Sequence, residues 1–167
     1  SRELMGAFLD AQIPPDIEEA ILSAFQVLRD TCGTNTTVAM RSSAVGEDSQ
    51  SSFAGQYRTI LNVTEDAILD AYKKVIASKY SASAIYYRIN YGLSDIETPM
   101  AVLVLEMINA KANGIIYTED IENQAADHLK IHAAWGLGEL LVSGEVSPDI
   151  ITVSKGKVPA VLDKKIA

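Results

Sequence analysis

The sequence has little of several features that would place a protein in a specialised class. Its one cysteine, Cys32, excludes an internal disulfide framework and favours a reducing compartment, so we expect a cytoplasmic protein. No stretch reaches the roughly 18 apolar residues that a membrane-spanning helix needs, and we expect no membrane partner. The N-terminal residues also lack the apolar core and cleavage site of a signal peptide.

Positive charge is scarce as well. The chain has 14 Lys and Arg against 22 Asp and Glu, a net charge of −8 at pH 7, which argues against a nucleic-acid partner. A nucleotide such as ATP is not excluded, because its site needs only a local cluster of donors and a metal. The 167 residues, 48% of them hydrophobic, suffice for one domain with a core. Without repeats or linkers, residues 1–167 are expected to form a single domain.

The stretch 38–56, VAMRSSAVGEDSQSSFAGQ, organises the rest of the chain. It begins as a short apolar strand and becomes polar after Arg41, which we place at the end of that strand. Small polar residues leave backbone N–H groups and hydroxyls free for an anion, and the arginine supplies positive charge at the base of the loop. The alternative is an ordinary solvated loop after a strand.

Hydrophobic periodicity predicts a mixture of helices and strands. A helix is expected over 14–29, with Asp16 as its N-cap, and the apolar run at 100–106 is expected to be a central strand buried on both faces. Further helices are expected at 64–79 and 81–91, and strands at 36–41, 57–63, 114–118, 128–134, 140–142 and 150–153, with a frayed tail over 154–167. Several neighbours would be antiparallel, so the predicted fold class is α+β, with a mixed, largely antiparallel sheet and packed helices.

Five motifs occur in a fixed order along this framework. They are RSSA with SFAGQ at 41–56, Tyr87-Arg88, MAVLVLEMINA at 100–110, GIIYT at 114–118 and AAWGLGELLVSGEVSPD at 133–149. In order and spacing they resemble the N-terminal ATP-binding domain of the phosphoenolpyruvate synthase and pyruvate phosphate dikinase family. The resemblance implies an ATP-grasp-like fold, and it covers most of residues 38–153.

The resemblance also implies a set of ATP-binding residues. Arg41 matches a family arginine and is expected on the phosphates, because its guanidinium is always charged and forks onto two oxygens. Ser42 either donates to phosphate or caps the turn. Gly55 corresponds to a position where the backbone approaches the nucleotide; the alternative is a bulge that needs positive φ.

The segment 106–108 resembles the family stretch whose backbone meets the adenine edge. Glu106, Met107 and Ile108 are therefore expected at the base, with Met107 either an apolar wall or simply a core residue. Leu105 stands where the family usually has Gln, so a side-chain contact there is lost or replaced. Glu139 in GLGE either accepts from the ribose hydroxyls or supports its loop.

Other polar residues are interpreted as structural. Arg88 is expected to form a structural ion pair rather than a ligand contact, and Trp135 to pack rather than stack. His128 and His132 have no Cys or carboxylate pattern around them that would make a metal site. No catalytic residue and no metal ligand is expected within these residues.

Several family motifs are missing from the sequence: the glycine-rich lid with its lysine, and the Asp-x-Glu and Gln-x-Arg-Pro motifs that hold magnesium and phosphates. The chain therefore resembles a fragment, a partial domain whose Mg²⁺ ligands lie outside it. The resemblance implies a parent enzyme that passes the β-phosphoryl of ATP to a histidine on a swivelling domain and then to pyruvate on another domain. The alternatives are an antibiotic or a glucan as acceptor, or a non-catalytic nucleotide-binding module.

Overall fold

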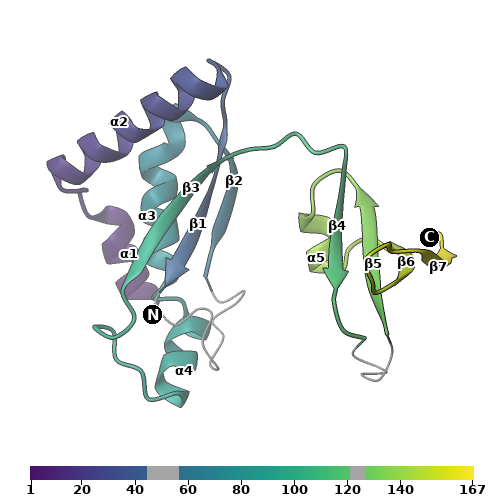
Figure 1. The fold of residues 1–167 in the computed structure, drawn as a ribbon. Helices are drawn as coiled ribbons and strands as arrows, with labels where there is room; N and C mark the ends of the chain where they lie inside the picture. The colour runs from purple at the N-terminus through teal and green to yellow at the C-terminus, as the bar shows by residue number, and fades with distance from the viewer. Residues whose placement is uncertain (45–56, 121–126) are drawn as a thin grey trace. The chain divides into compact units, whose positions relative to one another are not determined.

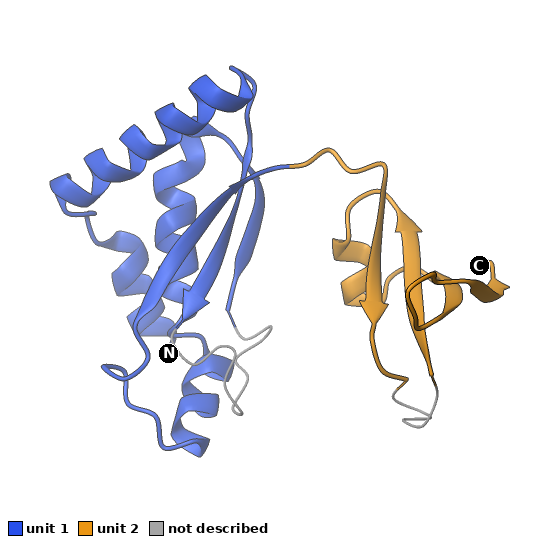
Figure 2. Ribbon diagram, viewed as in Figure 1, with its two compact units in different colours: residues 1–107 blue, residues 108–167 orange. Residues whose placement is uncertain are grey.

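The structure is a computed structural model that describes residues 1–44, 57–120 and 127–167. The chain divides into two compact units, residues 1–107 and 108–167, which Figure 2 colours separately. Each unit is described by itself below. That both units belong to one partial domain stays a prediction of the sequence analysis.

Unit 1 consists of a three-stranded antiparallel sheet and helices packed against it. Its strands are β1 (Val38–Ala44), β2 (Thr59–Val63) and β3 (Met100–Glu106), in the order β2-β1-β3. Its helices are α1 (Arg2–Asp10), α2 (Pro15–Cys32), the short 3₁₀ helix η1 (Glu65–Ala67), α3 (Ile68–Ser78) and α4 (Ala82–Asn90). In Figure 1, α2 and α3 lie on one side of the sheet. This side holds the core of the unit.

Alternation along the strands determines which residues enter that core. Val38 and Met40 of β1 are fully buried and pack with Phe25 of α2 and Val75 of α3. Val102 and Val104 of β3 pack against the same cluster. The other partly buried residues around it are Ile21, Leu28, Ile60, Ala67, Leu69 and Tyr72. Since successive strand residues point to opposite faces, the side chains between them leave the core.

The prediction that residues 100–106 form a central strand buried on both faces is wrong. Within the described residues β3 pairs only with β1, so β1 is the central strand and β3 lies at an edge. Leu103 and Leu105 remain 47% and 42% exposed on the face opposite the core. We call this face, defined by Ala39, Arg41, Leu103 and Leu105, the open face of the sheet. The core cluster of the described residues lies on the other face, and none of its members is on the open face.

Two predicted boundaries in unit 1 also shift. α2 begins at Pro15 with Pro14, not Asp16, at its N-cap, because proline's fixed φ and missing N–H suit the first turn of a helix. Asp16 instead lies inside that turn, where the helix dipole favours a carboxylate. β1 does not end at Arg41 but continues to Ala44, because residues 42–44 pair with residues 100–102 of β3.

Unit 2 is a four-stranded antiparallel sheet with one short helix. The strands β4 (Ala112–Tyr117), β5 (His128–Trp135), β6 (Asp149–Ser154) and β7 (Val161–Lys165) follow one another in sequence order, and α5 (Glu139–Ser143) precedes β6. The α+β class is thereby confirmed. Across the described ranges, no helix is long and apolar enough to cross a membrane.

Two predictions for unit 2 are wrong. Residues 140–142 belong to α5 rather than to a strand, because Gly138 at its N-cap has helical backbone angles and Gly144 ends it in the left-handed region. The tail is not frayed throughout, because β7 pairs with β6 from Ile150 to Val153.

Candidate functional site

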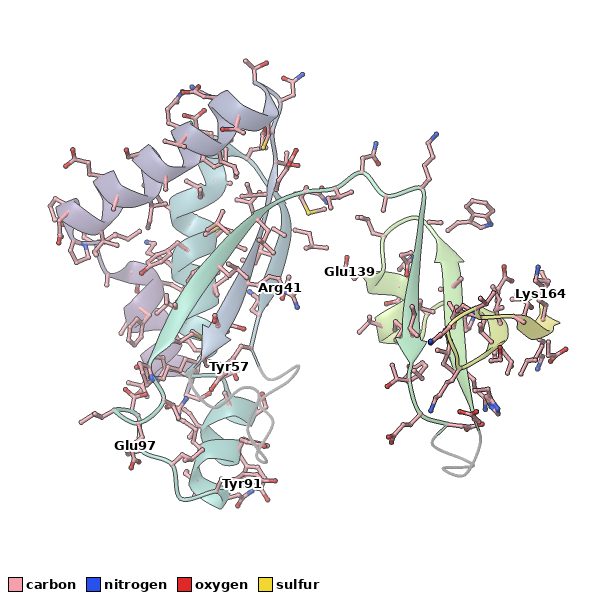
Figure 3. The ribbon with its side chains drawn as sticks, viewed as in Figure 1. Arg41, Tyr57, Tyr91, Glu97, Glu139 and Lys164 are labelled. Atoms are coloured by element: carbon pink, nitrogen blue, oxygen red, sulfur yellow. The ribbon has the colours of Figure 1, made fainter. Side chains whose placement is uncertain are left out.

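Arg41 projects from the open face of the sheet in unit 1. Its backbone lies between Thr59 of β2 and Leu103 of β3. By strand alternation its side chain is on the side of Leu103 and not on that of the buried Met40. Figure 3 shows the labelled side chain at the side of the sheet away from the helices. The residue is exposed, so an anion from solvent can reach its guanidinium.

Ser42 lies on the other face. It is half-buried opposite Val102 of β3, on the side of the sheet that carries the core. The side chains of Arg41 and Ser42 therefore leave the strand in opposite directions. A contact of both with one phosphate remains a prediction. Gly55, the third residue expected near the phosphates, falls outside the described residues.

Glu106 is the last residue of β3 and lies across from Val38, the first residue of β1. Its side chain is exposed, and its position in the alternation puts it on the core side of the sheet. There the carboxylate accepts a hydrogen bond from the Cys32 thiol at the end of α2, and this bond is the main cause that raises the pKa of Cys32. Glu106 and Arg41 are thus on opposite faces, about 10 Å apart along the strand direction.

The backbone after β3 is fixed at one further point. The Met107 amide donates to the Thr37 carbonyl oxygen over 2.9 Å. A backbone contact between adenine and Met107 would therefore use its carbonyl oxygen, because its N–H already has a partner. Ile108 begins unit 2 and is 75% exposed, and its carbonyl oxygen accepts from Ala110.

Glu139 begins α5 in unit 2 and is exposed; it is labelled in Figure 3. The turn before it is tied to β4. The Gly136 amide donates to the Lys111 carbonyl oxygen, and the Asn113 carboxamide nitrogen donates to the carbonyl oxygens of Ala134 and Gly136. Arg41 and Glu139 belong to different units, and the site that would join them remains a prediction.

Arg88 of α4 forms the ion pair that the sequence analysis expected. It is only 6% exposed, and its Nη1 donates to the Lys79 carbonyl oxygen over 2.6 Å. Asp95 balances both cations, at 2.9 Å from Lys79 Nζ and 3.7 Å from Arg88 Nη2. Tyr80 completes the group, since its hydroxyl donates to Asp95. The hydrogen bond from Lys79 is the main cause that holds the pKa of Asp95 below its ordinary value.

The two histidines of β5 have structural partners. His128 Nε2 lies 3.0 Å from Asp120, a carboxylate only 7% exposed, and Lys130 lies 3.0 Å from the same group. His132 makes an edge contact with the Tyr117 ring. Among the residues that the structure describes, no group of three or more His, Cys, Asp or Glu could hold a metal ion.

Sequence reasoning missed the surroundings of Arg41. Leu103 lies directly across from it and Leu105 two residues further on the same face. The register of the β1–β3 pair would have revealed these neighbours, because the residue directly across from Arg41 and every second residue from it lie on the same face as Arg41. Trp135, interpreted as a packing residue, is 84% exposed and is not buried within its unit, because it is the last residue of β5 and no described side chain covers its ring.

Comparisons with known proteins bear on this site. Residues 1–167 match the family described as "Pyruvate phosphate dikinase, AMP/ATP-binding domain". A protein of Methanocaldococcus jannaschii named probable phosphoenolpyruvate synthase is 38% identical over all of this chain and 14% of its own length. The phosphoenolpyruvate synthase of Aquifex aeolicus is 41% identical over 92% of this chain and 19% of its own length.

A relative with a different printed name is equally similar. The rifampicin phosphotransferase of Bacillus subtilis is 38% identical over all of this chain and 19% of its own length. The chain thus spans less than a quarter of the length of each of these three relatives.

Proposed function

Because the chain belongs to the family of pyruvate phosphate dikinase AMP/ATP-binding domains, we propose that it binds ATP with Arg41 on the phosphates. The observation that carries this assignment is the position of Arg41. Its permanently charged guanidinium is exposed on the open face of a sheet whose other face holds the core. A rigid strand thus presents a cation to solvent, which is what a triphosphate with about four negative charges requires.

The neighbours of Arg41 suit the rest of the nucleotide. Leu103 and Leu105 give the open face apolar surface beside the charge, and apolar surface of this kind favours a base or ribose over bulk solvent. The Met107 carbonyl oxygen is an acceptor for the adenine amino group, and the Glu139 carboxylate is an acceptor for ribose hydroxyls. The proposed ATP site, in an arrangement of the ATP-grasp type, also includes Ser42 and Gly55, which the family resemblance places near the phosphates, and the backbone of Glu106 and Ile108; the side chains of Ser42 and Glu106 point to the core face.

The longer protein is proposed to be a phosphoenolpyruvate synthase-like phosphotransferase of the cytoplasm. It would convert ATP, pyruvate and water to AMP, phosphoenolpyruvate and phosphate, by way of a phosphohistidine on another domain. The printed names of several relatives support this assignment. The rifampicin phosphotransferase relative supports the alternative, the same ATP-binding part with another acceptor.

Magnesium is part of the proposal, with a limited role for this chain. Mg²⁺, when bound, would neutralise part of the phosphate charge. The described residues offer no cluster of carboxylates to hold it, so its protein ligands are expected in other segments of the longer protein. What this chain contributes is the Arg41 guanidinium, which binds and orients the phosphates.

Titration calorimetry of the chain with Mg²⁺-ATP tests the proposal. We expect Arg41→Ala to weaken ATP affinity about 10- to 100-fold, as loss of a charged hydrogen-bond donor does. The matched control Arg2→Ala removes another exposed arginine and should leave the affinity unchanged. Equal affinity of Arg41→Ala and the unaltered chain would refute the role of Arg41, and no heat from the unaltered chain would refute ATP binding by these residues.

A further inference from the structure

We propose that Asn113 is a positioning residue for this site: its carboxamide holds the turn 136–138, and through it Glu139, in the geometry in which Glu139 meets the ribose. The ligand in this inference rests on the proposed function, whereas the geometry rests on contacts within unit 2. The sequence analysis gives Asn113 no role in the site.

The carboxamide of Asn113 bridges two backbone carbonyl groups. Its Nδ2 donates over 3.2 Å to the oxygen of Ala134 and over 3.1 Å to that of Gly136. An asparagine Nδ2 carries two hydrogens, so this one nitrogen can serve both acceptors. The first acceptor lies in β5 and the second lies just beyond its end. The side chain therefore fixes the point at which the chain leaves the sheet.

Both backbone polar groups of Gly136 are bonded to the start of β4, one to Asn113 and one to the residue just before the strand. Its amide donates over 2.9 Å to the Lys111 carbonyl oxygen, while its own carbonyl oxygen accepts from Asn113. Its φ of 80° is one that glycine adopts without strain. The direction of the turn is thus fixed by Asn113 of β4 and by Lys111, the residue before that strand, ahead of the start of α5.

Gly138 couples the turn to the same side chain. Its φ of −67° and ψ of −7° suit any residue, so its conformation does not require glycine. A Cβ at this position would lie 3.3 Å from Asn113 Oδ1, closer than ordinary van der Waals contact, so the carboxamide or the turn would have to shift by a few tenths of an ångström. Glu139 follows directly as the first residue of α5. A displacement of Gly138 away from Asn113 therefore moves the carboxylate that we assign to the ribose.

A double-mutant cycle between positions 113 and 138 tests this contact in the full 167-residue chain. Hydrogen exchange by NMR is measured at the amides of Gly136 and Val142, which bond to Lys111 and Gly138, with Ile131 in β5 as internal reference. We expect Asn113→Ala to speed exchange of the Gly136 amide about tenfold and to leave Ile131 unchanged. Gly138→Ala should perturb the turn in the native background and much less beside Asn113→Ala, where Oδ1 is gone.

A second readout links the turn to the nucleotide. We expect Asn113→Ala to weaken Mg²⁺-ATP binding to the same extent as Glu139→Gln, and the double variant to be no weaker than either single one. The matched control is Thr152→Ala, on the same face of the sheet but in β6, and it should change neither turn exchange nor affinity. A merely structural role of Asn113 would lower stability without this non-additivity.

Three outcomes would overturn the inference. The first is a Gly138→Ala effect of equal size in both backgrounds. The second is unchanged exchange of the Gly136 amide in Asn113→Ala. The third is additive losses of ATP affinity in the variant that combines Asn113→Ala with Glu139→Gln. Failure of the proposed function is distinguishable, because Glu139→Gln without effect on affinity would remove the ribose contact while the exchange rates still report whether Asn113 holds the turn.

Discussion

The guanidinium of Arg88 donates to the carbonyl oxygen of Lys79 over 2.6 Å, in surroundings that leave Arg88 only 6% exposed. This bond joins α4 to the end of α3, because Lys79 is the C-cap residue of α3. Asp95 and the Tyr80 ring complete the environment, with the Arg88 Cζ 5.6 Å from the centre of that ring. A buried charge with several partners is costly to disturb.

We predict that Arg88→Met destabilises the chain by about 2–3 kcal/mol, because the buried Lys79 carbonyl oxygen then lacks its donor. Urea unfolding followed by circular dichroism measures the change. Arg2→Met, at an exposed position of α1, serves as the control and should change the free energy of unfolding by no more than about 0.5 kcal/mol. Equal stability of the two variants would contradict the structural role of the bond.

We predict that the stabilising effect of Asp95 depends on pH. The hydrogen bond from Lys79 lowers the pKa of Asp95 from its ordinary value of 3.8, so the folded chain binds this proton less readily than the unfolded chain. The stabilisation is therefore fully present above pH 3.8 and is lost as the pH falls through the lower, folded value.

The measurement is the difference in free energy of unfolding between the unaltered chain and Asp95→Asn, taken at pH 6 and again below pH 3.8. The difference should shrink at the lower pH. In a Lys79→Met background the pH dependence should be much weaker, because the main partner is absent. A difference that stays constant with pH would count against the Lys79–Asp95 pair. Since the Asp95 side chain is 52% exposed, we expect a modest effect.

We predict opposite results for two neighbouring residues of β3. Val104 packs on the core and Leu105 is 42% exposed on the open face. Val104→Ala should cost about 1–2 kcal/mol of stability with little loss of ATP affinity. Leu105→Ala should cost at most about 0.5 kcal/mol but weaken ATP binding by roughly two- to fivefold. Urea unfolding measures the stability of both variants, and calorimetry measures their ATP affinity. If Leu105→Ala lost stability but kept its ATP affinity, the nucleotide would bind elsewhere.

Local patterns predicted α2, α3, α4 and most strands of this fold, but neither α1 nor α5. The spacing of Ile21, Phe25 and Leu28 marks the face of α2 that packs on the core. The strands predicted at 36–41 and 57–63 correspond to β1 and β2, which pair antiparallel. These successes share a cause, because the residues that signal each element lie within a few positions of one another.

The errors arose where the deciding contact is distant or depends on one backbone angle. An unbroken apolar run such as 100–106 does not reveal whether its strand has one neighbour or two. The tail forms β7 because β6 offers it an edge, and residues 140–142 turn helical because of Gly138 and Gly144. For the site, residue types and motifs suggested Arg41 and Glu139. The sequence did not show on which face of the sheet Arg41, Ser42 and Glu106 lie, because that depends on how β1 pairs with β3.

The hydrogen bond between Cys32 and Glu106 has a practical consequence for handling the protein. Only the deprotonated sulfur attacks reagents and other thiols, and the raised pKa keeps this sulfur protonated at neutral pH. Cys32 is the sole thiol of the chain, so we expect slow air oxidation to crosslinked pairs of molecules. At a given pH a maleimide dye should attach to the unaltered chain more slowly than to Glu106→Gln, which lacks the carboxylate that raises the pKa of Cys32.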